Sequence, residues 1–101
     1  MGDRVLMQCV SGDRKSFGPV VYCHWSGSKA LDIVRRLRDR MQGRSGDVEY
    51  SSARLVQEAC NGSEGNTGFG IWNALEPLTE SNSHGDAGVI LINVDNGHSV
   101  E

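Results

Sequence analysis

Hydrophobic and polar positions along the chain follow two repeats, one typical of strands and one typical of helices. Residues 5–10 and 19–25 are rich in apolar, β-branched and aromatic side chains, which predicts two strands. The polar, glycine-flanked stretch 11–18 predicts a long hairpin loop between them. A first helix is predicted by apolar residues spaced three or four positions apart: Ala30, Ile33, Val34, Leu37 and Met41. A second helix is predicted by a similar repeat: Val48, Ser52, Leu55, Val56 and Ala59.

The limits of both helices are also predicted by local sequence. The segment 26–28 interrupts the second strand and offers a serine hydroxyl as an N-cap for the first helix. Gly43 ends that helix, and Asp47 is the N-cap candidate of the second. Asn61 and Gly62 then tolerate the left-handed conformation that closes many helices.

The remainder of the chain indicates more strands separated by a long polar loop. Residues 69–74 and 88–94 are predicted strands, and the continuous apolar run 89–92 is typical of a strand covered on both faces. Residues 75–86 are mostly polar and longer than an ordinary connection, a pattern that often carries function. The sequence 95–97, Asp-Asn-Gly, predicts a type I′ hairpin, after which 98–100 returns as an edge strand. We therefore predict one α+β domain over residues 1–101, in the order ββααββ, with a mixed or antiparallel sheet and two helices on one side.

Composition narrows the class of protein. The 101 residues are 38% hydrophobic and 23% charged, as in ordinary soluble domains. The three cysteines lack any C-x-x-C spacing, so we expect no disulfide framework, no metal site and no cofactor. No apolar run is long enough for a membrane span and no signal-peptide pattern opens the chain, which predicts a cytoplasmic protein that does not bind membranes.

Charge is distributed unevenly along the chain. Residues 29–44 contain six basic and two acidic side chains, whereas from Leu55 onward there is no Lys or Arg and seven Asp or Glu. An arginine-rich helix is usually a solvated face held by local ion pairs. The formal charge of −3 argues against direct binding to nucleic acid. We therefore expect the acidic side chains of the long loop, Glu76, Glu80 and Asp86, to meet a basic surface of another protein.

A second group of candidate side chains lies at residues 22–25. Tyr22, His24 and Trp25 stand close together, and Trp is enriched at the centres of protein interfaces. Cys23 and His24 point to opposite faces of a strand, so they cannot form a thiolate pair. The glycine-rich stretch 65–70 precedes a strand instead of opening a helix, which argues against a phosphate loop.

Four short motifs together resemble a known family. They are Gly2-Asp3-Arg4, Tyr22-x-His24-Trp25-x-Gly27, Ala53-Arg54-Leu55 and Gly85-Asp86-x-Gly88-Val89. In this combination the chain resembles a family of small phage, prophage and mobile-element accessory proteins that carry a Tyr-x-His-Trp-x-Gly motif. The chain has Asp3, Ser26 and Ile90 where that family has Asn, Asn and Tyr. The resemblance implies a biological context, a bacterial host, and no particular reaction.

These observations lead to a functional prediction with two alternatives. We expect a non-enzymatic phage or mobile-element protein that binds a host protein or a defence ribonucleoprotein complex stoichiometrically, as an anti-CRISPR-like inhibitor in the bacterial cytoplasm. The expected partner-binding residues are Glu76, Glu80, Asp86, Tyr22, His24 and Trp25. The first alternative is a small-ligand or nucleotide-binding protein, or sponge, with its site at Tyr22, His24 and Trp25 beside the loop 75–88. The second is a small hydrolase, which is disfavoured because no nucleophile, base and orienting group can be assigned together.

Overall fold

The most apolar strand of the chain lies in the middle of the sheet. The computed structural model describes residues 4–23, 29–42, 44, 46–60, 69–79 and 88–100. All six residues of β1 (Val5–Val10) are buried, because side chains on both of its faces are covered. The other strands are β2 (Val20–Cys23), β3 (Phe69–Trp72), β4 (Gly88–Asn93) and β5 (Ser99–Val100). The helices are α1 (Ala30–Arg40) and α2 (Val48–Cys60).

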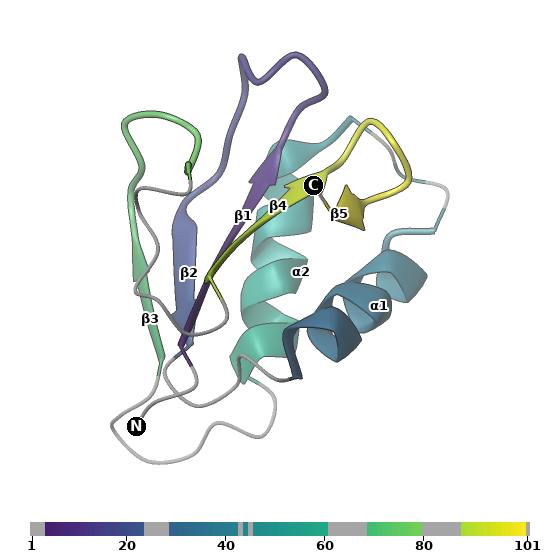
Figure 1. Ribbon diagram of the computed structural model, residues 1–101. Coiled ribbons are helices and arrows are strands. Elements are labelled where there is room, and N and C mark those ends of the chain that lie inside the picture. The colour runs from purple at the N-terminus through teal and green to yellow at the C-terminus, as the bar shows by residue number, and fades with distance from the viewer. Residues whose placement is uncertain are drawn as a thin grey trace.

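The strands form one mixed sheet in the order β3-β2-β1-β4-β5. β1 pairs antiparallel with β2 and parallel with β4, while β3 and β5 form the two edges (Figure 1). The hairpin between β1 and β2 is closed by a Val10–Phe17 bridge and a hydrogen bond from the Ser11 amide to the Ser16 carbonyl. The predicted α+β fold with helices on one side of the sheet is confirmed. The described part holds five strands, and each lies in a segment predicted to be a strand, although the summary order ββααββ counts one strand fewer.

Both helices cover the same face of the sheet, which we call the inner face (Figure 1). All five apolar residues predicted for the first helix are buried there, and Leu55 and Ala59 of α2 join them. Val5, Met7 and Cys9 of β1 complete this core from the sheet side, as the alternation of a strand requires. The hydrophobic repeat therefore predicted the helical side of the core correctly.

The opposite, outer face of the sheet carries a second and smaller core. Leu6 and Val20 are buried there against Leu78, with Tyr22 and Leu91 packed around them. Leu78 belongs to segment 73–79, which follows β3 and folds back over the outer face. The described start of the predicted polar loop is thus anchored to the sheet.

One local prediction is wrong, and another lies outside the described residues. Helix α1 begins at Ala30, and Lys29 before it makes no side-chain capping hydrogen bond, whereas the serines predicted as its cap, within 26–28, are not among the described residues. The turn after β4 spans 94–98 instead of two residues, and its positive φ angles fall on Gly97 and His98. The cause is that His98 turns inward to a buried hydrogen bond with Ser51, which a tight Asn-Gly hairpin would not allow. The Asp47 cap is confirmed, since its carboxylate accepts the Tyr50 amide at 2.9 Å.

Candidate functional site

Two aromatic rings lie together on the outer face near the β3 edge. Tyr22 of β2 and Trp72 of β3 have ring centroids 6.2 Å apart. Trp72 pairs with Val20 across the two strands, and paired residues share a face of the sheet. Trp72 is 44% exposed, whereas Tyr22 is half-buried against the outer core. The Trp72 ring is thus partly exposed to solvent, and the Tyr22 ring packs beside it.

Segment 73–79 is held beside these rings by a buried glutamine. The Gln8 side chain donates from Nε2 to the Gly18 carbonyl oxygen at 2.9 Å and accepts the Leu78 amide on Oε1 at 2.8 Å. Gln8 is completely buried, so these two hydrogen bonds give its side-chain amide one donor and one acceptor partner in place of water. Together with the packing of Leu78, they fix one end of the segment to β1.

The anchored segment places an apolar side chain and a carboxylate in solvent next to Trp72. Leu75 is 98% exposed, and Glu76 is also exposed. Trp72, Leu75 and Glu76 line a pocket of about 210 Å³ together with residues of the outer core. We call the four residues Tyr22, Trp72, Leu75 and Glu76 the aromatic–acidic patch.

Two residues of this patch were also proposed from the sequence, and their role in binding stays a prediction. Sequence reasoning predicted Tyr22 and Glu76 as binding residues from two distant parts of the chain, and the structure places both in one surface. It did not propose Trp72 at the end of β3 or Leu75 three residues later, although a Leu in the mostly polar stretch that follows a strand was a usable signal. The other predicted residues, His24, Trp25, Glu80 and Asp86, lie outside the described residues.

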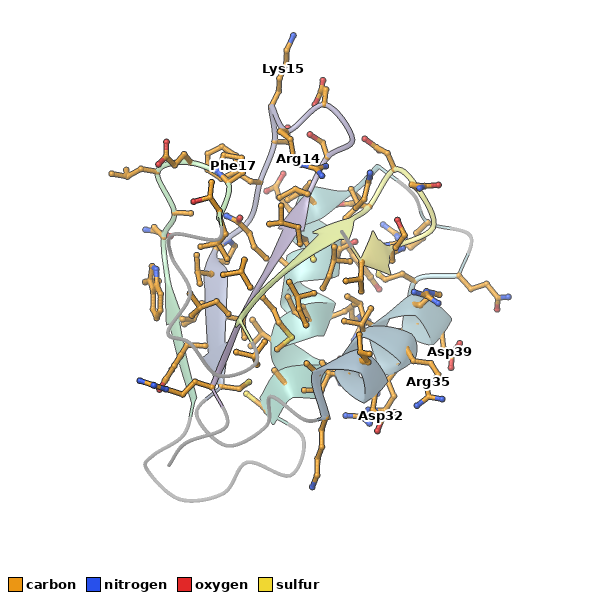
Figure 2. The ribbon with its side chains drawn as sticks, viewed as in Figure 1. Arg14, Lys15, Phe17, Asp32, Arg35 and Asp39 are labelled. Carbon is orange, nitrogen blue, oxygen red and sulfur yellow. The ribbon has the colours of Figure 1, made fainter. Side chains whose placement is uncertain are left out.

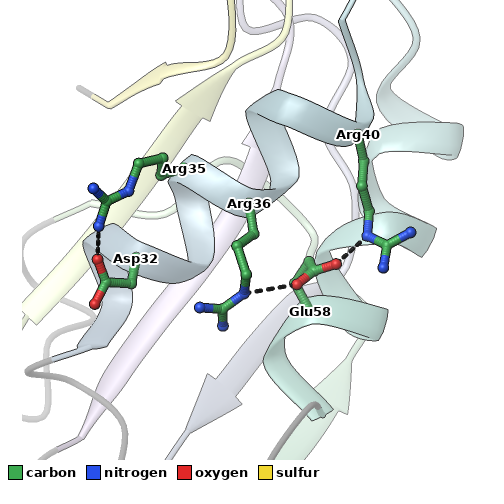
Figure 3. A network of polar contacts seen from close by, with 5 residues as sticks. All are labelled: Asp32, Arg35, Arg36, Arg40 and Glu58. Carbon is green, nitrogen blue, oxygen red and sulfur yellow. Dashed lines mark hydrogen bonds and ion pairs between the residues drawn. The ribbon is translucent and has the colours of Figure 1, made fainter.

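The arginines of α1 are engaged in ion pairs and hydrogen bonds. Arg36 donates from Nε to Glu58 of α2 at 2.8 Å, and Arg40 contacts the other oxygen of the same carboxylate (Figure 3). Arg35 pairs with Asp32 one turn earlier, on a side of α1 that faces away from the sheet (Figure 2). The interpretation of this helix as a face held by local ion pairs is supported at Arg35 and Asp32, whereas Arg36 and Arg40 pair with a carboxylate of another helix.

Two of the carboxylates that follow Leu55, those of Glu58 and Asp95, form hydrogen bonds within the protein. Burial of Glu58 opposes its ionisation, but the hydrogen bonds and charges of Arg40 and Arg36 outweigh it and hold the pKa of Glu58 below its usual value. Asp95 accepts the Gly12 amide at 2.7 Å and so ties the turn after β4 to the β1–β2 loop. The acidic surface expected from sequence is thus reduced by these two side chains, while Glu76 stays exposed.

A buried Ser–His contact raises the possibility of hydrolytic chemistry. Ser51 Oγ lies 2.9 Å from His98 Nε2, and both residues are buried. Burial, and to a lesser degree the charge of Arg38, lowers the pKa of His98, which favours a neutral imidazole. However, Ser51 is 0% exposed in the first turn of α2, so a substrate carbonyl has no path to its hydroxyl. The contact joins α2 to the β4–β5 turn and does not constitute a nucleophilic site.

Two of the three cysteines in the described segments lie in the core, and the third lies at the surface. Cys9 and Cys23 are buried, and burial raises the pKa of Cys9 to about 12 and that of Cys23 to about 11. Cys60 at the end of α2 is exposed. Over the same segments, no cluster of His, Cys, Asp and Glu has the arrangement of a metal site.

Comparison with protein-family models, with curated proteins and with solved structures finds no significant match to this chain. Neither α1 nor α2, the helices of the described segments, has the length and apolarity needed to cross a lipid bilayer.

Proposed function

We propose that this protein is a binding module that acts by stoichiometric association with another protein through the aromatic–acidic patch. The observation that carries the proposal is the exposure of Leu75, at 98%, beside Trp72 on a segment whose end is fixed by Gln8 and Leu78. Leaving large apolar side chains in water is unfavourable, and contiguous exposed apolar surface is typical of interaction sites. Trp and Tyr are also the residue types that dominate interface energetics.

Anchoring favours affinity, because a surface that is already ordered loses less conformational entropy on binding. In this surface, Leu75 and Trp72 would fill an apolar depression of the partner, and Glu76 would face a basic side chain at its rim. An opposite charge at the rim acts mainly on the association rate and is screened by salt. Association is therefore expected to slow as ionic strength rises.

The patch fits a protein partner better than a small ligand. Its pocket of about 210 Å³ is smaller than the roughly 300–1,000 Å³ typical of small-molecule sites. As the partner class we propose a bacterial host protein or a defence ribonucleoprotein complex, in keeping with the family resemblance of the Tyr22–Gly27 motif. Within that class the protein would act as an inhibitor that occupies its target without chemical turnover.

The experiment compares capture of bacterial proteins by the wild-type chain with capture by two matched variants. Leu75→Lys places a charge in the patch, whereas Leu31→Lys makes the same change on α1, where Leu31 is 66% exposed. We expect at least one protein to be captured by wild type and Leu31→Lys and lost with Leu75→Lys. Capture that is equal for all three chains, or that is lost only with Leu31→Lys, would contradict the proposal.

Charge reversal tests the role of Glu76 separately. Glu76→Lys is expected to slow association with the captured protein, while Arg35→Glu, which disturbs only an exposed pair with Asp32, leaves the rate within about twofold. Reversal of Arg36 or Arg40 is a poor control, because these side chains hold Glu58 and their loss would also destabilise the fold.

A further inference from the structure

The edge strand β3 lacks the features that normally protect a sheet edge. In the described part of the chain β3 pairs only with β2. Residues 69–74, Phe-Gly-Ile-Trp-Asn-Ala, include no charged residue and no proline. Natural edge strands usually carry Lys, Pro or an inward-pointing charge that discourages pairing with another chain. Within the described residues, this edge is therefore open to strand addition.

Both faces of β3 also expose apolar side chains. Ile71 is 50% exposed on the inner face, and Trp72 is 44% exposed on the outer face. Ile71 borders a groove of about 330 Å³ beside α2 that is lined mainly by apolar residues, including Pro19, Val48 and Val56. A strand added to β3 would cover side chains on both faces at once.

We propose that this edge pairs with β3 of a second copy of the chain, antiparallel and centred on Ile71. In such a dimer the two-fold axis runs perpendicular to the sheet. Each residue of one β3 then lies opposite a residue of the other β3 whose side chain is on the same face of the sheet. Centring on Ile71 puts Ile71 opposite its own counterpart and Trp72 opposite Gly70 of the other copy. The result is one continuous sheet across both copies.

The proposed register is sterically self-complementary. Gly70 has no side chain, and a Cβ at its position would come no closer than 3.8 Å to any neighbouring atom, the nearest being a carbon of the Tyr22 ring. The Trp72 indole of the second copy can therefore lie over Gly70, an arrangement in which an aromatic ring covers a strand glycine. The absence of charge in residues 69–74 means that two identical strands approach without repulsion, although the whole chain carries −3. These features favour a second copy as the occupant of the edge.

This arrangement has a consequence for recognition. A two-fold axis perpendicular to the sheet leaves both outer faces on the same side, so the two aromatic–acidic patches lie next to each other. A partner with two equivalent sites would then be bound more tightly, because binding at the first patch raises the effective concentration of the second. The dimer and the patch share Trp72, but they can be tested separately, since Ile71 at the centre of the dimer lies outside the patch and Leu75 of the patch lies outside the paired strands.

The test is the mass of the protein in solution as its concentration is raised. A short strand pair buries little surface, so we expect a dimer with a dissociation constant of about 1–100 μM. Sedimentation equilibrium of the wild type should move from 11.0 kDa toward twice that mass over this range. Ile71→Lys and Ile71→Glu should each remain monomeric, because like charges would face each other at the centre.

Mixing the two Ile71 variants tests the register itself. An equimolar mixture of Ile71→Lys and Ile71→Glu should form a heterodimer, since opposite charges then face each other. Leu31→Lys should dimerise like the wild type, and circular dichroism should show that every variant is folded. Wild-type protein that stays monomeric to about 500 μM, or a mixture that stays monomeric, would overturn the proposal. So would an Ile71→Lys variant that dimerises normally.

Partner capture separates this inference from the proposed function. Leu75→Lys should lose the captured protein and still dimerise, whereas Ile71→Lys should be monomeric and still capture it with reduced avidity. A wild-type monomer whose β3 is instead paired by a strand of the captured protein would contradict the dimer and leave the proposed function standing.

Discussion

Replacement of Gln8 by leucine tests whether segment 73–79 is anchored as described. Leucine has a similar size but cannot donate to the Gly18 carbonyl or accept the Leu78 amide. Each buried group left without a partner costs about 1–3 kcal/mol. Two such groups amount to about 2–6 kcal/mol, from which the better burial of leucine recovers about 1–2 kcal/mol. The difference spans about 0–5 kcal/mol, and we expect a net loss near its middle, about 2–3 kcal/mol, which is a large part of the stability of a domain of this size.

Urea denaturation followed by circular dichroism measures this loss. With a slope of about 1–2 kcal/mol per molar urea, the midpoint of Gln8→Leu should fall by at least about 1 M. Amide hydrogen exchange gives a local readout, because the Leu78 amide should lose protection more than the amides of α2. The control is Gln42→Leu, since Gln42 is exposed after the end of α1 and its replacement should change stability by less than about 0.5 kcal/mol. A Gln8→Leu variant within about 0.5 kcal/mol of wild type, or a Leu78 amide that is unprotected in the wild type, would refute the reasoning.

Three further predictions concern titration and ion pairing. Ellman's reagent should modify Cys60 quickly in the native protein and leave Cys9 unmodified until the chain unfolds, because Cys9 is buried with a pKa raised to about 12; equal rates for the two thiols would count against this. The lowered pKa of His98 means that the unfolded chain binds more protons below pH 6.5, so stability should be complete above pH 6.5 and fall as the pH drops below it. His98→Asn should flatten that fall between pH 6.5 and 5, and an unchanged profile would exclude His98 as its source. Glu58→Gln should lower the free energy of unfolding, measured in a thermal or urea melt, by about 1–2 kcal/mol at pH 7, since its arginine partners are partly exposed and a neutral amide compensates them only partly. Because the pKa of Glu58 is lowered from 4.5, the difference in stability from wild type should shrink as the pH falls below that value. A difference that stays constant with pH would be inconsistent with this ion pair.

Features of the fold that depend on contacts between residues close in sequence could be predicted, whereas features that depend on contacts between distant residues could not. The stripe that includes Ile33, Val34 and Leu37 is repeated within one helix, so local spacing is enough to predict which residues are buried. The cap at Asp47 is equally local. By contrast, the hydrogen bond between Gln8 and Leu78 joins residues 70 positions apart, and nothing near either residue indicates it.

The candidate site was only half predictable for the same reason. Tyr22 and Glu76 were predicted from residue type and charge, but their proximity depends on segment 73–79 folding back over the sheet. The wrong hairpin prediction has a similar cause, because the inward turn of His98 is set by Ser51 on a different element. Glu58 was counted with the acidic surface although Arg36 and Arg40 bind it from another helix.

The central claim is that the aromatic–acidic patch is the surface that binds a protein partner. The most direct measurement is hydrogen exchange of the chain alone and in complex with the protein it captures. The account predicts added protection in residues 70–79 on binding, with the exposed turns of α1 around Arg35 unchanged. Protection confined to α1, with residues 70–79 exchanging as fast as in the free chain, would contradict the account.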